Sequence, residues 1–358
     1  MCPQDALMPA NQPRTAERPL RRGDAVDIRP ADEILATLDA DGKLEGMPFM
    51  PEMVPFCGQR HRVFRRAEKT CVEGAGIRLL GGNVFLEGLR CDGAFHEGCQ
   101  RGCLFFWNEA WLKPVGDGIS PLPPGEGPGV RASPPGEAPT SGYPGVRASP
   151  PGEAPTSGYP GVRARPVAPP TLPPTRRNGR FYCQSTELLA ATRPLPPLGI
   201  RHFWRDFISG EERPGRLARI FARQALNKIR RTVGLKPYGA PAGDRPGGPK
   251  GDLDLQPGEW VEVRSREEIL ATLDPDGKNR GLSFEVEMLE HCGRRYRVAY
   301  PVRKIILEMT GAMAELVHTV ILDGVACEGT CAKSCPRRNY FYWRESWLRR
   351  VAGPPPQQ

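Results

Sequence analysis

The chain of 358 residues lacks long apolar runs and the short motifs typical of many enzymes. No run approaches the roughly 20 apolar residues that span a bilayer. Residues 1–22 lack the apolar core of a signal peptide, so we expect a cytoplasmic protein without a transmembrane segment. The nucleotide-binding patterns G-x-G-x-x-G and G-x-x-x-x-G-K-[ST], the zinc-protease motif H-E-x-x-H and the nucleophile elbow G-x-S-x-G are also absent. The sequence therefore does not point to a particular reaction.

One set of motifs occurs twice, in the same order and with similar spacing. The shared motifs are G-[DE]-x-V-[DE]-[IV]-R, [DE]-E-I-L-A-T-L-D-x-D-G-K, E-M-x-x-x-C-G, C-[DE]-G and W-x-E-x-W-L. A duplication of this length predicts two copies of one domain. We place copy one at residues 23–115 and copy two at residues 251–353.

Short β-strands with little helix are the pattern of each copy. The opening motif alternates apolar and charged residues, which predicts a half-buried strand. The D-E-I-L segment predicts a helix of about two turns, and W-x-E-x-W-L predicts a terminal helix that packs both indoles into the core. The strand-initial motif resembles the opening of SH3-like barrels, which implies a mainly β fold of two small SH3-like barrels. The tandem arrangement with F-Y-C-Q at 181–184 also resembles bacterial tandem-repeat proteins, a resemblance that implies no activity.

The segments outside the copies differ from them in composition. Residues 116–178 are rich in Pro, Gly and Ser and contain G-V-R-A-S-P-P-G-E-A-P-T-S-G-Y-P twice without a change, which predicts a disordered linker. Residues 179–250 predict a basic helical connector. Residues 1–22 and 354–358 predict terminal tails without a fold.

The net charge of +9 is concentrated around the connector. Residues 176–250 contain 16 Lys and Arg against 5 Asp and Glu, a difference of +11 that leaves −2 for the rest of the chain. The segment G-R-L-A-R-I-F-A-R-Q-A-L-N-K-I-R-R-T-V-G predicts a basic amphipathic helix. Residues 176–250 are a candidate surface for nucleic acid or an anionic membrane, although no nucleic-acid-binding motif accompanies them. The alternative is that the arginines solubilise a helix docked on the barrels.

Eleven cysteines without an export signal favour thiols or metal ligands over disulfides. In copy one, Cys91, His96, Cys99 and Cys103 place three thiols and an imidazole within thirteen residues. Thiolate sulfur and imidazole nitrogen are the donors that zinc prefers, so we predict a structural zinc site of the Cys3His type. An iron–sulfur cluster ranks below zinc, and buried inert thiols are the alternative to any metal. The possible substitute ligands are Cys57, Cys71 and Cys183, the last two without a counterpart in copy two.

Copy two keeps only part of this cysteine pattern. Cys327 and Cys335 align with Cys91 and Cys99, whereas Ala332 replaces the histidine and Asn339 replaces the third thiol. We expect a weaker site, or none, and its candidate ligands are Cys292, Cys327, Cys331 and Cys335, with His291 as a nitrogen donor.

Three functions are consistent with these features. We favour a non-enzymatic binding or scaffold protein with a structural zinc site in copy one and a protein partner. The alternative is a metal- or thiol-dependent enzyme, or an enzyme accessory subunit, that uses the cluster around His96. The third is an adaptor that binds nucleic acid or a membrane surface through the connector.

Overall fold

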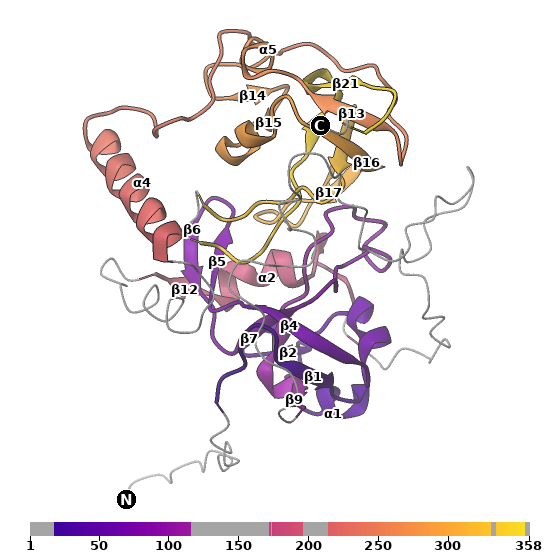
Figure 1. Cartoon of the computed structure of the whole chain (residues 1–358). Helices are drawn as coiled ribbons and strands as arrows, with labels where there is room; N and C mark the ends of the chain where they lie inside the picture. Colours follow the sequence, from indigo (N-terminus) through magenta and orange to yellow (C-terminus); the bar gives the residue numbers. More distant parts are fainter. Residues whose placement is uncertain (1–17, 116–171, 173, 196–213, 331–333, 355–358) are drawn as a thin grey trace, which may run out of the picture.

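The chain folds mainly into antiparallel β-strands with a few short helices, which confirms the predicted mainly β class (Figure 1). The computed structural model describes residues 18–115, 172, 174–195, 214–330 and 334–354. The two predicted terminal tails and the predicted linker therefore lie almost entirely outside the described residues, as do part of the connector and Cys331. Within the described ranges, no helix is both long enough and apolar enough to cross a membrane.

Copy one is built on a five-stranded sheet with the order β8-β7-β4-β1-β9. Its strands are β1 (Ala25–Ile28), β4 (Arg60–Arg66), β7 (Asn83–Leu86), β8 (Trp107–Asn108) and β9 (Leu112–Pro114). The smaller elements are α1 (Ala31–Leu35), β2 (Lys43–Leu44), β3 (Met47–Pro48), the 3-10 helices η1 (Pro51–Phe56) and η2 (Glu109–Trp111), and the hairpin β5 (Lys69–Val72) and β6 (Gly76–Leu79).

Copy two has a sheet of the same order, β20-β19-β16-β13-β21. Its strands are β13 (Trp260–Val263), β16 (Arg295–Pro301), β19 (Thr319–Leu322), β20 (Trp343–Arg344) and β21 (Leu348–Arg350). The smaller elements are α5 (Arg266–Leu270), β14 (Lys278–Asn279), β15 (Leu282–Ser283), η3 (Val286–His291), β17 (Lys304–Ile306), β18 (Met313–Glu315) and η4 (Glu345–Trp347). The register shifts after Val63 in β4 and after Val298 in β16, so even the irregularity is repeated. Among the described strands none pairs β8 with β9 or β20 with β21; no closed barrel forms, and the SH3-like barrels stay a prediction.

The tryptophans of W-x-E-x-W-L are fully buried, as predicted, but the terminal helix is wrong. Trp107 lies in β8, and Trp111 ends the single 3-10 turn η2 before β9 begins. Strands β8 and β9 pair with β7 and β1, so their backbone groups are committed to the sheet and cannot form a helix. The indole N–H of Trp111 donates to Thr37 Oγ1 at 3.0 Å, and Phe49 packs edge-on against both rings.

Part of the predicted connector belongs to copy one. Helix α2 (Gln184–Ala191) begins with Gln184, whose side-chain amide donates to the carbonyls of Pro48 and Phe106 and accepts from the Phe106 N–H. Strand β12 (Arg193–Pro194) then pairs with β6, while β10 (Arg176–Arg177) and β11 (Arg180–Phe181) form a hairpin before α2. These contacts make the first part of the connector a fixed element of copy one.

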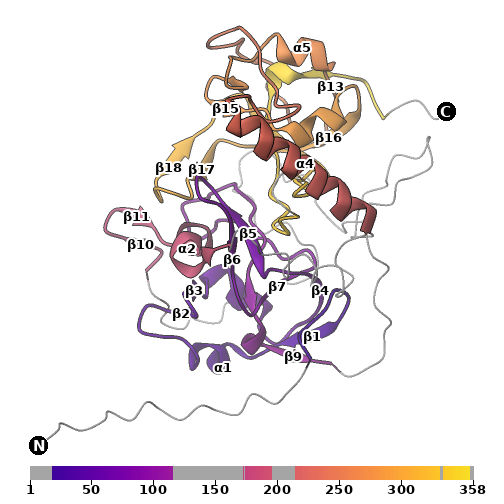
Figure 2. The ribbon, with the colours of Figure 1, turned by 90° about the vertical axis from the view of Figure 1, so that its left-hand side faces the viewer.

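The remaining connector contains the predicted basic helix, α4 (Pro214–Thr232). Figure 1 shows α4 at one side of the molecule, and Figure 2, turned by 90°, shows it on the face toward the viewer. Ile220 is buried on one side of the helix, whereas Leu226 and Ile229 on another side are exposed.

The repeated C-[DE]-G motif contains a glycine that the fold requires. Gly93 and Gly329 have φ angles of 72° and 74°, in the left-handed region. A Cβ atom at Gly93 would lie 2.1 Å from the carbonyl oxygen of Cys99, and one at Gly329 would lie 2.3 Å from that of Cys335. The motif is therefore a tight turn that packs within the cysteine loop of its own copy, which comprises residues 91–103 in copy one and, among the described residues, 327–330 and 334–339 in copy two.

We predict that Gly93→Ala lowers the free energy of unfolding by about 3 kcal/mol, through left-handed backbone strain and the clash with Cys99. Gly88→Ala is the matched control, because Gly88 has the same φ of 72° and no atom lies within 4 Å of its added Cβ. It should cost only about 1 kcal/mol. Urea denaturation measures both values, and equal losses would contradict the steric argument.

Candidate functional site

One group of metal-ligating side chains converges in copy one. Donor atoms of Glu52, Cys91 and His96 lie within 4.8 Å of one another. Glu52 is in η1, and the other two belong to the loop that follows β7, which folds back through the turn at Gly93. The structure thus brings together two of the four predicted ligands and adds a carboxylate that the sequence analysis missed.

His96 uses both ring nitrogens within the protein. Its Nδ1 lies 2.5 Å from Glu52 Oε1 and its Nε2 lies 3.1 Å from the carbonyl oxygen of Tyr182. Both partners are acceptors, so both nitrogens carry protons in this arrangement. Burial alone lowers the pKa of His96, but the hydrogen bond and charge of Glu52 raise it above its ordinary value. His96 and Glu52 therefore form a buried, closely spaced pair within the cluster.

Glu52 keeps one oxygen unsatisfied. Its Oε1 accepts from the Phe95 N–H at 3.2 Å as well as facing His96. Its Oε2 is buried and has no hydrogen-bond partner among the described residues. A buried carboxylate oxygen without a partner is costly, so this atom marks a position where a cation would be stabilised.

Burial raises the pKa of two thiols at this cluster. Burial, the charge of Glu52 and the nearby Cys103 raise the pKa of Cys91 well above its ordinary value. Burial likewise raises the pKa of Cys183 to about 12, with Cys103 as a neighbouring thiol. Cys103 and Cys183 thus border the cluster without belonging to the converging group. Cys57 lies elsewhere in the core, where its thiol faces the Met53 carbonyl.

Among its described residues, the corresponding region of copy two has the carboxylate of Glu287 and the thiol of Cys327. Glu287 occupies the position of Glu52 and accepts from the Glu328 N–H at 2.8 Å. Burial and the charge of Glu287 raise the pKa of Cys327. His291 pairs through Nδ1 with the Tyr296 hydroxyl, and burial lowers its pKa to about 4. The E-M pair of the repeated motif was the sequence signal for both buried glutamates.

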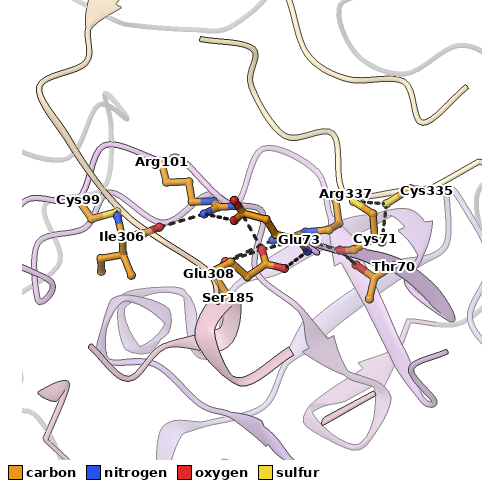
Figure 3. A network of polar contacts seen from close by, with 10 residues as sticks. All are labelled: Thr70, Cys71, Glu73, Cys99, Arg101, Ser185, Ile306, Glu308, Cys335 and Arg337. Atoms are coloured by element: carbon orange, nitrogen blue, oxygen red, sulfur yellow. Dashed lines mark hydrogen bonds and ion pairs between the residues drawn. The ribbon is translucent and has the colours of Figure 1, made fainter. Parts of the chain in front are cut away.

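Three further predicted ligands, Cys71, Cys99 and Cys335, lie at a contact between the copies (Figure 3), whereas Cys292 packs against the core of copy two. Cys99 Sγ accepts from the Ile306 N–H at 3.3 Å, and Cys335 Sγ accepts from the Cys71 N–H at 3.1 Å. Cys71 and Ile306 occupy equivalent positions, each eight residues after the valine at the register shift of its copy. The contact is thus approximately twofold symmetric, with each cysteine loop bound to a strand of the other copy.

Two equivalent arginines complete the symmetry. Arg101 donates to the Ile306 carbonyl at 2.9 Å, and Arg337 donates to the Cys71 carbonyl at 2.8 Å. Ile306 is thus bound through its carbonyl by Arg101 and through its N–H by Cys99. Cys71 is bound in the same way by Arg337 and Cys335. Strands β17 and β5 are held in this way by a sulfur and a guanidinium from the other copy.

Glu308 lies at the centre of the contact and is shared by both arginines (Figure 3). Its carboxylate is 3.1 Å from Arg101 and 2.8 Å from Arg337, and it accepts from Ser185 Oγ and the Glu73 N–H. Burial acts to raise the pKa of Glu308, but the two guanidinium groups hold it below its ordinary value. Glu73, the equivalent residue of copy one, is 54% exposed and lies 3.9 Å from Arg101.

The two thiols nearest the centre face each other. Cys335 Sγ and Cys71 Sγ are 3.2 Å apart, and Cys335 is buried. Burial acts to raise the pKa of Cys335, but the Cys71 thiol, the Arg337 backbone N–H and the Arg337 charge together lower it to about 7. Among the cysteines whose pKa is shifted, Cys335 alone is shifted downward within the described part of the chain.

Comparison of the chain with protein-family models, with curated proteins and with solved structures finds no match.

We predict that Glu308→Gln destabilises the protein by about 3 kcal/mol at neutral pH, because it leaves two buried arginines without their shared anion. Glu73→Gln is the matched control and should cost less than about 1 kcal/mol, since Glu73 is largely solvated. Denaturant unfolding monitored by tryptophan fluorescence compares the two variants. Equal losses of stability in the two variants would show that the buried charge of Glu308 does not stabilise the contact between the copies.

The same ion pairs predict an acid sensitivity. The folded-state pKa of Glu308 is below its ordinary value of 4.5, so its contribution is complete above pH 4.5 and is lost as the pH falls through the folded-state pKa. The stability difference between the wild type and Glu308→Gln should therefore shrink on acidification. A difference that stays constant down to pH 3 would contradict this assignment.

Proposed function

We propose that the protein is a non-enzymatic binding protein in which two SH3-like modules form one platform for a protein partner. In each sheet a single 3-10 turn links the two end strands, an arrangement that supports the small-barrel interpretation. The contact around Glu308 supports a fixed relation between the modules, because its charge is neutralised by residues from both copies. A platform of this kind presents two related surfaces in one orientation.

The state of Cys91 and His96 favours a binding role for their cluster over thiol catalysis there. A nucleophilic cysteine requires a thiolate, and burial keeps the pKa of Cys91 far too high for one near neutral pH. His96 directs its nitrogens to Glu52 and Tyr182, so neither serves as a base for Cys91. These contacts favour a structural role for the cluster over the enzyme alternative.

Zinc held by copy one is part of the proposal. The unpartnered Oε2 of Glu52 is the observation that carries it, because it lies buried beside a thiol and an imidazole. Zinc takes four ligands from sulfur, nitrogen and carboxylate oxygen, and it replaces the protons of those ligands on binding. Glu52, Cys91 and His96 supply three donors, and the neighbouring Cys103 and Cys183 are the candidates for the fourth. The predicted ligand Cys99 is not needed, since its sulfur binds copy two.

Elemental analysis of the full chain tests the zinc site. We expect about one zinc per chain, as for a closed structural site, and loss of most of that zinc in Cys91→Ser. Cys327→Ser, at the aligned position of copy two, should retain it. A chelator should lower the melting temperature of the wild type but leave that of Cys91→Ser unchanged. Wild-type protein that is free of zinc after expression with added zinc would refute the site without affecting the platform.

A second candidate function, attachment to an anionic membrane surface, is favoured by the orientation of α4. Ile220 is buried, and Arg216 on the same side donates to the Glu328 carbonyl at 2.7 Å. Ile229 on another side is 62% exposed, and Val233, the residue that follows the helix, is 64% exposed. The helix thus contacts the protein through a partly basic side and presents an apolar side to the surroundings, the arrangement of an interfacial helix.

Charge selects anionic lipid as the partner of this surface. Residues 214–232 contain six Arg and Lys and no acidic residue. Exposed Arg219 and Lys228 accompany the apolar side and suit the phosphates of a bilayer surface. Nucleic acid fits less well, because it would need the basic side that carries Arg216, and this side is turned toward Glu328.

Co-sedimentation of the full chain with vesicles tests this surface. We expect binding to phosphatidylglycerol-containing vesicles, little binding to pure phosphatidylcholine, and weakening by salt. The double variant Ile229→Ser/Val233→Ser should reduce binding at least about tenfold. Met309→Ser/Val317→Ser, which removes exposed apolar side chains elsewhere, should leave it unchanged. Binding to RNA or DNA without binding to vesicles would replace the membrane hypothesis with the nucleic-acid one.

A further inference from the structure

The contact between the copies contains a pair of thiols that its symmetry does not require. Cys71 lies in β5 of copy one and Cys335 lies in the cysteine loop of copy two, 264 residues later. Their sulfur atoms are 3.2 Å apart. A disulfide bond is about 2.0 Å long, so the two atoms need to approach by only about 1.2 Å.

The equivalent contact on the other side of the symmetric interface shows what packing alone demands. There, Cys99 accepts a hydrogen bond from the backbone of Ile306, which has no thiol. Isoleucine therefore satisfies the backbone geometry as well as cysteine does. Packing therefore does not require a thiol at position 71, yet Cys71 places one within reach of Cys335.

The surroundings of the pair favour reaction at Cys335. Arg337 donates to the Cys71 carbonyl at 2.8 Å, and its positive charge acts on both thiols. The Cys71 N–H donates to Cys335 Sγ, and such contacts stabilise a thiolate. Cys71 is half-buried, so the pair borders solvent on that side, whereas Cys335 is enclosed.

We propose that Cys71 and Cys335 are a redox-active thiol pair that a hydroperoxide oxidises to a disulfide between the two copies. The Cys335 thiolate attacks the peroxide, an S–O bond forms as the O–O bond breaks, and the departing oxygen leaves as water or an alcohol after protonation. The Cys71 sulfur then attacks the sulfenic acid at Cys335, so that the S–S bond forms as the S–O bond breaks and a molecule of water leaves. Two thiols lose two electrons, and one hydroperoxide gains them.

The disulfide would act on the whole chain. It would close a covalent loop between residues 71 and 335 that includes the connector and most of copy two. Such a link opposes separation of the copies in the unfolded chain, so oxidation should stabilise the assembled state. The inference does not depend on zinc or on membrane binding, because neither proposal uses Cys71 or Cys335.

Peptide mapping of the full chain tests the pair. The protein is treated with hydrogen peroxide, its remaining thiols are alkylated, and the digest is analysed by mass spectrometry. We expect a cross-link between the peptides of Cys71 and Cys335 that dithiothreitol removes. Oxidation should also raise the melting temperature by about 5 °C or more. Cys335→Ser should lose the cross-link, whereas Cys99→Ser, at the equivalent position, should keep it.

A gain-of-function variant makes the test independent of any loss of folding. Ile306→Cys places a thiol opposite Cys99 and should add a second cross-link, between position 306 and Cys99, under the same treatment. The proposal is overturned if peroxide leaves Cys71 and Cys335 fully alkylatable in folded wild-type protein. It is equally overturned if Cys335 becomes linked to Cys327 or Cys331 instead of Cys71.

Discussion

The buried carboxylate of Glu308 sets the constraint on which the relation between the copies depends. An ionised carboxylate that is almost fully removed from water is tolerated only when cations and hydrogen-bond donors surround it. Arg101 reaches it from copy one and Arg337 from copy two, while Ser185 reaches it from α2. The charge is therefore compensated only when three segments that are distant in sequence lie together. The closeness of Cys71 to Cys335 follows from the same assembly.

The symmetry of the contact between the copies is broken at one pair of equivalent carboxylates, Glu73 and Glu308. A duplicated domain that binds itself uses equivalent residues on both sides, as Arg101 and Arg337 do. The equivalent carboxylates of Glu73 and Glu308 cannot both be buried beside each other, because two like charges in a dry site repel. One is enclosed by both arginines and the other is left partly in solvent. A near-symmetric interface thus requires one asymmetric charge at its centre.

Sequence patterns predicted the strands and the core better than the site. Alternation identified β1 and β13, and the apolar character of Trp107 and Trp111 identified core positions. The four-residue spacing of these tryptophans fits a helix and also a strand–turn–strand segment, and only pairing with β7 and β1 decides between them. The sequence predicts that Cys99 is a zinc ligand of copy one because Cys91 and Cys103 lie close to it along the chain. Its sulfur points instead to Ile306, a contact more than 200 residues away that no local spacing encodes.

The cysteines then divide by the charge that they face. Cys91 lies beside the buried carboxylate of Glu52, which disfavours a thiolate unless a metal cation accompanies it. Cys335 lies beside the guanidinium of Arg337, which favours a thiolate without any metal. The cysteine loop of copy one is thus suited to holding a cation through Cys91, whereas the cysteine loop of copy two is suited to thiol oxidation at Cys335. Glu52 and the Cys71 thiol both come from outside the cysteine loop that they contact, so duplication of the loop alone does not duplicate its chemistry.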